Sequence, residues 1–255
     1  MTVSISAEGR VALVTGSTRG IGLAMAQALA EQGATAVLHG RGEADAEARA
    51  EELRASGLKA MAVWGDLAEP ENTRALVPAV IAKAGKVDIL INNAGAIHRS
   101  ELAEHSEADW RKVVEVNLNA TFLLCQAAAG DMRPRGWGRI INTASIHSVS
   151  SRPTIPAYVS TKHAMNGLTK ALATELGSTG ITVNAIAPGY IDTDFNEALI
   201  NNEAFDAMVK SRTPVGRWGH SDDMAGAAVF LASDAASYVN GHLLVVDGGM
   251  TTALY

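Results

Sequence analysis

Tyr158 and Lys162 stand four residues apart, at the start of a stretch, 157–177, whose pattern predicts a helix. Residues i and i+4 share a helix face, with Cβ atoms about 5–6 Å apart. An ammonium group that close favours the phenolate, so it lowers the pKa of a tyrosine from its usual value of about 10. A tyrosine tuned in this way can act as a general acid or base near neutral pH. We therefore predict proton transfer by Tyr158.

A serine and a glycine-rich loop give this pair its weight, because a Y-x-x-x-K pattern alone is usually a solvated helix face. Ser145 ends the strand that begins at Arg139, at the carboxyl edge of the expected sheet, where its hydroxyl can hold a substrate oxygen beside Tyr158. The loop runs directly from the apolar stretch Val11–Val14 and reads Thr15-Gly16-Ser17-Thr18-Arg19-Gly20-Ile21-Gly22.

A strand, a glycine-rich turn and a helix N-terminus together form a binding site for a pyrophosphate. Gly16 permits the tight turn, Gly20 lets the backbone approach a phosphate, and Gly22 lets the helix pack closely on the strand. The spacing is G-x-x-x-G-x-G rather than the general G-x-G-x-x-G, and an ordinary βα turn is the alternative. The strand–turn–helix context favours a dinucleotide site.

These residues must be positioned by alternating strands and helices. The expected strands are fully apolar runs, as in parallel sheets buried on both faces: Val11–Val14, Ala36–Leu38, Ala60–Val63, Ile89–Ile91, Ile140–Asn142, Thr182–Ala185 and Leu243–Val246. Helices are expected over 21–32, 43–55, 71–84, 107–131, 157–177 and 222–232, with a capping box at Ser106 and Asp109 and terminating glycines at 33, 57 and 85. This alternation predicts an α/β fold, a doubly wound parallel sheet with helices on both faces. The polar helical stretch 192–218 interrupts the rhythm and is expected to form a small substrate lid.

Composition limits the function classes. The 255 residues are 47% hydrophobic and 19% charged, which allows one domain, 1–255, with a sizeable core. A net charge of −6 argues against nucleic-acid and anionic-membrane partners. The only cysteine, Cys125, fits a reducing compartment, and no secretory signal or apolar spanning run is visible, so we expect a cytoplasmic protein. The seven histidines show no metal-ligand spacing, so no metal is expected.

Further motifs follow in order along the chain: Asp66-Leu67, Asn92-Asn93-Ala94-Gly95, Asn117, Pro188-Gly189 and Val246-Asp247-Gly248-Gly249. With the glycine loop, Ser145, Tyr158 and Lys162, they make the chain from Arg10 to Gly249 resemble the classical short-chain dehydrogenase/reductase family. The residues around the pocket are similar to the branch that contains gluconate 5-dehydrogenase and 2-deoxy-gluconate 3-dehydrogenase. His147 departs from that branch, where a glutamine or a bulkier residue is expected.

The resemblance implies a Rossmann-like fold and a catalytic tetrad. Tyr158 is implied to be the proton donor in reduction and the base in oxidation, and Ser145 to orient the substrate carbonyl. Lys162 is implied to lower the pKa of Tyr158 and to bind the nicotinamide ribose. Asn117 is implied to hold a water that links Lys162 to solvent, or else to tie a helix kink to a neighbouring strand.

The implied cofactor site is Gly16, Ser17, Thr18, Arg19, Gly20, Ile21, Gly22, Arg41, Asp66, Leu67, Asn93, Ala94, Gly95, Tyr158, Lys162, Pro188, Gly189, Ile191 and Thr193. Asp66 is also a candidate N-cap for the helix after Pro70. An alternative role for Asn93, Ala94 and Gly95 is purely structural. The alternative for Pro188-Gly189 is an ordinary turn after a strand.

The end of the second strand favours NADP over NAD. An NAD site places an acid there to bind the ribose 2′-hydroxyl, whereas an NADP site uses arginine. Here Gly40 holds the acid's place and Arg41 follows, while Arg19 lies in the glycine loop. Two arginines can clamp a phosphate bidentately. Glu43 lies nearby and leaves NAD as the alternative.

The branch implies hydride transfer on a sugar acid such as gluconate or 5-keto-gluconate. The expected substrate contacts are Ser145, Arg99, His147 and Arg152, the last three toward a carboxylate, and Tyr190 and Asn196 toward hydroxyls. For each of these residues, a position at the rim of the pocket without a role in binding is an equally good interpretation. Two rival functions stay open: a 3-oxoacyl-carrier-protein reductase and a non-catalytic NADP-sensing protein.

A homotetramer of about 106 kDa is expected, four times the chain mass of 26.6 kDa. The stretches 120–125 and 164–172 carry more apolar and small residues than one sheet-facing stripe needs. A second interface is expected along Leu243–Val246 and the tail to Leu254 and Tyr255.

Overall fold

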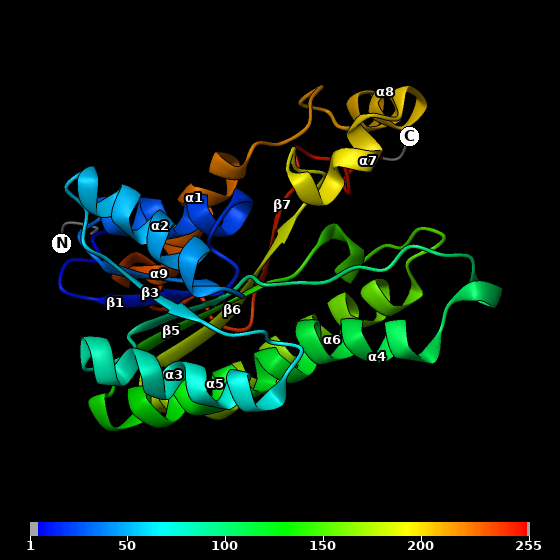
Figure 1. The fold of residues 1–255 in the computed structure, drawn as a ribbon. Coiled ribbons are helices and arrows are strands. Elements are labelled where there is room, and N and C mark those ends of the chain that lie inside the picture. The colour runs from blue at the N-terminus through cyan, green and yellow to red at the C-terminus, as the bar shows by residue number, and fades with distance from the viewer. Residues whose placement is uncertain (1–4, 254–255) are drawn as a thin grey trace.

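A single seven-stranded parallel sheet forms the centre of the protein (Figure 1). The structure, a computed structural model, describes residues 5–253, so the expected tail contacts of Leu254 and Tyr255 lie outside the described residues. The strands are β1 (Val11–Val14), β2 (Thr35–Gly40), β3 (Ala60–Trp64), β4 (Ile89–Asn92), β5 (Gly138–Thr143), β6 (Ile181–Pro188) and β7 (Leu243–Val246). Their order, β3-β2-β1-β4-β5-β6-β7, is that of a doubly wound sheet. The predicted fold class is confirmed.

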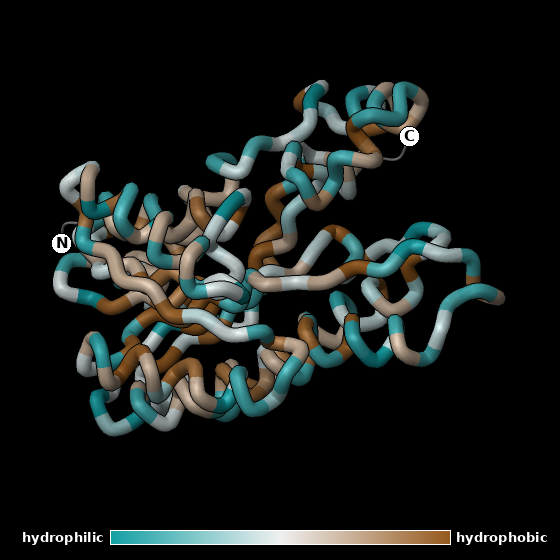
Figure 2. Tube along the Cα trace, in the orientation of Figure 1, coloured by the Kyte–Doolittle hydropathy of each residue, from teal (hydrophilic) through white to brown (hydrophobic). Residues whose placement is uncertain are grey.

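Helices cover both faces of the sheet. One face carries α1 (Gly20–Glu31), α2 (Glu43–Ala55) and α9 (Ala225–Ala232), and the other carries α3 (Pro70–Ala84), α5 (Ala120–Met132) and α6 (Pro156–Leu176) (Figure 1). Side chains alternate along β1 between two apolar clusters: Ala12 and Val14 face α1, whereas Val11 and Leu13 face α3 and α5. This explains why the strands are mostly apolar, as the brown segments at the centre of the molecule show in Figure 2.

The helix expected over 107–131 is three segments. It consists of α4 (Glu107–Val114), a π-helical turn at Glu115–Asn119, and α5. A π-turn leaves the hydrophobic pattern almost unchanged, so the sequence does not reveal it. Ser106 caps α4 as expected, since its hydroxyl accepts from the N–H of Asp109 over 3.1 Å. The Asp109 carboxylate accepts from the Ser106 hydroxyl rather than from its backbone, so the box is incomplete.

The carboxyl ends of the strands form the functional edge. Strand order reverses between β1 and β4, and the glycine loop and the segment after Asn92 leave the sheet there. The expected lid leaves between β6 and α9 and contains α7 (Glu197–Ile200) and α8 (Glu203–Arg212), which stand clear of the sheet in Figure 1. A bridge between Ile191 and Gly219 joins its two ends.

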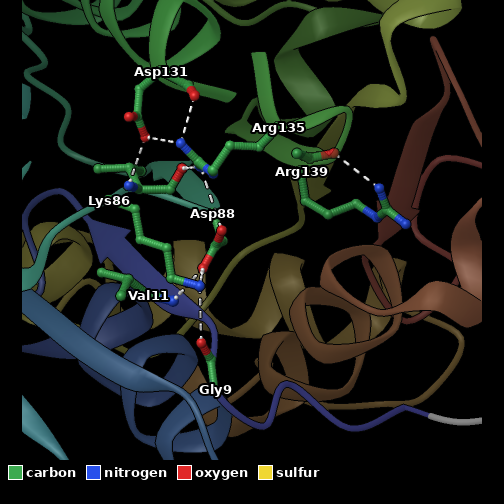
Figure 3. Close-up of polar contacts among 9 residues, drawn as sticks. Gly9, Val11, Lys86, Asp88, Asp131, Arg135 and Arg139 are labelled. Atoms are coloured by element: carbon green, nitrogen blue, oxygen red, sulfur yellow. Dashed lines mark hydrogen bonds and ion pairs between the residues drawn. The ribbon is translucent and has the colours of Figure 1, made fainter. Parts of the chain in front are cut away.

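The opposite edge of the sheet is held by an ionic network (Figure 3). The buried Asp88 carboxylate accepts from the N–H of Val11 over 3.0 Å and pairs with Lys86 at 2.8 Å and Arg135 at 3.3 Å. Arg135 also pairs with Asp131. These contacts join the beginnings of β1, β4 and β5, far from the functional edge.

Within residues 5–253, no helix is both long and apolar enough to cross a membrane.

Candidate active site

Tyr158, Lys162 and Ser145 meet at the carboxyl edge of β5. Helix α6 begins at Pro156, which suits the first helical turn, and so carries Tyr158 and Lys162 on one face. Lys162 Nζ lies 5.5 Å from the centre of the Tyr158 ring and donates to the carbonyl of Thr143 over 2.5 Å. Ser145 lies two residues beyond the end of β5 at Thr143, rather than ending the strand as expected, and its Oγ accepts from the N–H of His147 over 3.1 Å.

The electrostatics of Tyr158 differ from the sequence-based expectation. Burial raises the pKa of Tyr158, and a hydrogen bond with Ser145 and the charge of Arg99 oppose that rise only in part. Lys162 directs its ammonium at Thr143, and burial lowers the pKa of Lys162 to about 8. The expectation that Lys162 holds the pKa of Tyr158 below its usual value is therefore wrong for this arrangement. Tyr158 keeps its proton at neutral pH, which suits a proton donor.

Asn117 ties the π-turn to two neighbouring segments. Its Oδ1 accepts from the N–H of Ala96 over 2.7 Å, and its Nδ2 donates to the carbonyl of Ala96 and to Thr161 Oγ1. Thr161 Oγ1 donates in turn to the carbonyl of Tyr158. Both amide hydrogens are used within the protein, so a bound water would have to donate to Asn117 rather than accept from it.

The glycine loop is shaped as a cradle. Gly16 has φ +62°, and a Cβ there would lie 2.9 Å from Ala94 Cα. Gly20 has φ +55°, the left-handed region that favours glycine. A Cβ on Gly22 would lie 2.3 Å from the Gly16 carbonyl, so helix and strand pack as closely as predicted. This space above the N-terminus of α1 fits the pyrophosphate of a dinucleotide.

Asn93 and Thr15 hold the cradle in shape. The Asn93 amide donates to the carbonyls of Thr15 and Gly16, while Thr15 Oγ1 accepts from the N–H groups of Asn93 and Ala94. The structural alternative for Asn93 therefore holds, and it leaves the backbone of Ala94 and Gly95 beside the loop.

His39 is a support that sequence reasoning missed. It is 2% exposed in β2, its Nδ1 accepts from the N–H of Gly16 over 3.1 Å, and its Nε2 donates to the carbonyl of Gly65 over 3.0 Å. Burial lowers the pKa of His39 to about 4, so the ring is neutral. A histidine inside an apolar strand was the only signal in the sequence.

The end of β2 carries a glycine and an exposed arginine where an NAD site would carry an acid. Arg41 is exposed, and a Cβ on Gly40 would lie 2.7 Å from Thr18 Cγ2, so an acidic side chain has no space there unless Thr18 moves. A third arginine, Arg49 of α2, donates to the carbonyl of Thr18 over 3.0 Å. Sequence reasoning missed Arg49, because a charged residue in an exposed helix carries no local signal.

The side chain of Arg19 points toward the 192–218 segment rather than toward Arg41. Its guanidinium pairs with Asp194 at 3.1 Å, and both side chains are about 70% exposed. An ion pair this exposed is weak, about 0–1 kcal/mol. The clamp of Arg19 and Arg41 on a phosphate therefore stays a prediction, and it would require Arg19 to leave Asp194.

Two predicted loop contacts have other roles as well. Asp66 does not cap the following helix, since the N-cap of α3 is Glu69. Its carboxylate accepts from the N–H of Ala68 over 2.9 Å. Gly189 follows β6, and a Cβ there would lie 2.8 Å from Asp247, so a close approach of two segments requires glycine.

Arg99 and Arg152 form a cationic pair beside Tyr158. Arg99 donates to the carbonyl of Phe195 over 3.3 Å, and Arg152 lies over the ring of Phe205. Burial and the charge of Arg152 lower the pKa of Arg99. Among the described residues, neither guanidinium forms an ion pair with a carboxylate. Two like charges held together without a counter-ion indicate an anion site.

A backbone bond holds the two arginine loops together. The N–H of Ser100 donates to the carbonyl of Thr154 over 3.0 Å. Thr154 has φ +71°, an uncommon conformation for a residue with a branched side chain. The strain lies at the pocket, where such outliers tend to occur.

Aromatic side chains of the 192–218 segment, and that of Tyr190 just before it, pack near Tyr158. Tyr190 packs edge-on against Phe205 and Trp218, and Phe195 lies 6.2 Å from Tyr158 between ring centres. Asn196 does not face the pocket freely, because its amide donates to the carbonyl of Ile191. Tyr190 also borders a cavity of about 220 Å³ between the lid and the ends of β6 and β7.

His147 cannot serve the carboxylate as a charged group. Burial, together with the charges of Arg152 and His163, lowers its pKa to about 4. The imidazole is therefore uncharged at neutral pH, and the expected contact of His147 with a substrate carboxylate stays a prediction without an ionic component.

Known proteins match almost the whole chain. The family model described as enoyl-(acyl carrier protein) reductase covers residues 16–251. Gluconate 5-dehydrogenase of Gluconobacter oxydans is 44% identical over 98% of this chain and 97% of its own. 2-Dehydro-3-deoxy-D-gluconate 5-dehydrogenase of Pseudoalteromonas atlantica is 45% identical over 98% of both chains. The chain belongs to the short-chain dehydrogenase/reductase family.

A solved structure of this family agrees with the fold in detail. It is a gluconate 5-dehydrogenase of Burkholderia cenocepacia in complex with NADP and tartrate, 44% identical, with a TM-score of 0.96 over 99% of each chain. The protein described here is therefore an oxidoreductase of the short-chain dehydrogenase/reductase family.

Proposed function

We propose that this dehydrogenase transfers a hydride between NADP(H) and a secondary alcohol or ketone of a sugar acid, such as gluconate or 5-keto-gluconate. The observation that carries this is the cationic pair of Arg99 and Arg152 beside Tyr158. Arg152 is half-buried and Arg99 is exposed, and within the described residues neither side chain has a carboxylate partner. A carboxylate on the substrate would neutralise both. The relatives named gluconate dehydrogenases support the same class.

The cofactor would lie across the carboxyl ends of β1 and β4. Its pyrophosphate fits above the Gly16–Gly22 cradle, the adenosine beside Asp66 and Leu67, and the nicotinamide beside Pro188, Ile191 and Thr193. Arg41 is the residue we assign to the 2′-phosphate, with NAD as the alternative cofactor. When bound, the nicotinamide supplies the hydride chemistry.

The protein's own residues position the substrate and move a proton. We assign Ser145 to the reacting oxygen: its Oγ accepts from the N–H of His147, and its hydroxyl hydrogen, which here is directed at Tyr158, would turn to that oxygen when a substrate binds. Tyr158, with its raised pKa, gives its proton to that oxygen in reduction. Lys162 is held by its hydrogen bond to the Thr143 carbonyl, and we assign it to the nicotinamide ribose.

The test is a panel of sugar acids and polyols, with NADP(H) and NAD(H) side by side. We expect NADPH-dependent reduction of 5-keto-D-gluconate. Arg99→Met and Arg152→Met should each lower kcat/KM by about tenfold or more, since hydrogen bonds to charged groups contribute about 1.5–3 kcal/mol. Arg74→Met, on the exposed face of α3, is the matched control. No turnover of any sugar acid would overturn the proposal.

An acetoacetyl thioester in the same panel tests the rival reading as a 3-oxoacyl-carrier-protein reductase. That reaction needs a basic surface for an acidic carrier protein, and the net charge of −6 disfavours it. A thioester turned over faster than every sugar acid would favour the rival.

We infer further that the protein is a homotetramer in the cytoplasm. Trp110 of α4 and Phe122 of α5 are 40% and 45% exposed, and every residue of β7 at the sheet edge is only half-buried. A second copy covering each face would bury this apolar surface. The single cysteine, Cys125, is buried and unpaired, which fits a reducing compartment.

A further inference from the structure

His147 lies between the groups that we assign to the reacting oxygen and the lid. Its backbone N–H donates to Ser145 Oγ over 3.1 Å. Its ring centre lies 6.3 Å from that of Tyr158 and 6.3 Å from that of Tyr190, edge-on to both. The residue is 8% exposed. The imidazole is therefore part of the pocket wall beside the place of the reacting carbon.

Ser150 determines which nitrogen of this ring carries the proton. Ser150 Oγ donates its single hydrogen to the carbonyl of Ile146 over 2.9 Å, so toward the imidazole it can only accept. His147 Nδ1 lies 3.4 Å from that oxygen and is the donor. In a neutral imidazole the other nitrogen, Nε2, is then an acceptor.

The Nε2 lone pair is available to a ligand. The ring is neutral, because burial together with Arg152 and His163 lowers the pKa of His147 to about 4. Nε2 has no hydrogen-bond partner among the described residues, yet it is not one of the fully buried atoms that lack one. It therefore keeps contact with the space around it. An acceptor of this kind binds a hydroxyl and repels a carbonyl or carboxylate oxygen, neither of which carries a proton at neutral pH.

We propose that His147 Nε2 accepts a hydrogen bond from a hydroxyl on the carbon next to the reacting carbon, so that the enzyme selects α-hydroxy ketones and vicinal diols. This inference rests on the proposed function and narrows its substrate class. Arg99 and Arg152 bind the carboxylate at one end of the substrate, while His147 binds a hydroxyl on the carbon next to the one that is reduced.

Two keto acids test this directly. 5-Hydroxy-4-oxopentanoate and 4-oxopentanoate share the carboxylate and the reacting ketone and differ by one vicinal hydroxyl. With NADPH, we expect kcat/KM to be at least about tenfold higher for the hydroxylated acid, because a site built to bind a hydroxyl rejects the analogue that lacks it. In His147→Phe the ratio should fall to within about twofold of one. In His147→Gln, whose amide can reach the place of Nε2, part of the ratio should return.

His163→Phe is the matched control, since His163 is an exposed histidine of α6, and its ratio should equal that of the wild type. Calorimetric titration of both acids into the enzyme–NADP⁺ complex, which cannot reduce a ketone, gives the ratio of their affinities without turnover. An unchanged ratio in His147→Phe, or equal affinity of the wild type for the two acids, would overturn the inference. Failure of the proposed function is a separate result, namely no reduction of 5-keto-D-gluconate.

Discussion

Tyr158 keeps its proton near neutral pH, since burial raises its pKa. Tyr158→Phe removes that proton and barely changes the side-chain shape. We expect kcat to fall by at least about 10²-fold, the lower end for general acid–base catalysis. NADPH affinity, measured by fluorescence titration, should stay within about twofold of the wild type. Near-normal turnover by the variant would remove Tyr158 from the mechanism.

Arg41 tests the cofactor assignment. Arg41→Asp places a like charge beside the 2′-phosphate, so NADPH affinity should fall by about tenfold or more while NADH affinity changes little. Isothermal titration with both cofactors measures the two constants. Arg74→Asp makes the same charge change on the far face of the sheet and should leave both constants unaltered. A preference ratio that Arg41→Asp does not alter would show that another residue sets selectivity.

Residues with a positional signature could be predicted, and residues defined by a three-dimensional contact could not. Gly16 and Gly22 follow from the strand–turn–helix pattern, and the structure shows why a side chain fits at neither. His39 and Arg49 reach the glycine loop from segments more than twenty residues away, which no local pattern records. The orientation of Arg19 toward Asp194 depends on the fold of the 192–218 segment, which no local pattern records, and the clamp of Arg19 with Arg41 stays a prediction.

At the scale of elements, the strands were predictable because parallel strands buried on both faces are short runs rich in apolar residues, with only a few buried polar ones such as Asn142 and Asn184. The π-turn at Glu115–Asn119 was not, because it changes backbone hydrogen bonding without changing the apolar period. The turn matters to the site, since it places Asn117 where its amide reaches both Ala96 and α6.

The ionic network at the far edge of the sheet is expected to stabilise the fold without touching catalysis. Asp88→Ala leaves the buried N–H of Val11 without a partner, which costs about 1–3 kcal/mol of the free energy of unfolding. Urea unfolding measures this loss. Lys86→Met removes only a partly exposed ion-pair partner and should cost about 1 kcal/mol or less. Turnover should be unchanged in both variants, and a loss of NADPH affinity in Asp88→Ala would contradict the separation of the two edges.

For the whole molecule, two buried histidines predict a loss of stability in mild acid. The pKa values of His39 and His147 are lowered from 6.5 to about 4, chiefly by burial. Between these values the unfolded chain binds protons that the folded chain does not, so the free energy of unfolding falls as pH falls. Each imidazole should cost about 2 kcal/mol at pH 5 relative to pH 7.

Urea unfolding at pH 7 and pH 5 checks this, and His39→Asn should show the smaller difference. The titration of Asp223 does not contribute to the difference in stability between pH 7 and pH 5. Hydrogen bonds from Arg217 and from the backbone of His220 lower its pKa to about 2, so its contribution is lost only as pH falls below 3.8. Equal stability of the wild type at the two pH values would contradict the neutral, buried state of both rings.

The proposed homotetramer predicts the mass of the protein in solution. Light scattering coupled to size exclusion should give about 106 kDa, four times 26.6 kDa. Phe122→Glu places a charge on the exposed face of α5 and should reduce this mass by half or more. A monodisperse species of about 27 kDa for the wild type at micromolar concentration would contradict the tetramer.

The bridge between Ile191 and Gly219 brings the two ends of the 192–218 segment to one point of the sheet. The N–H of Asp192 donates to Gly219 and the N–H of Gly219 donates to Tyr190, over 2.8 and 2.9 Å, and a Cβ on Gly219 would collide with Ile191. A segment closed at its base can change in length at little entropic cost to the rest of the chain. Insertions, deletions and substitutions in this segment can therefore alter which substrates bind, while the sheet and the glycine loop stay unchanged.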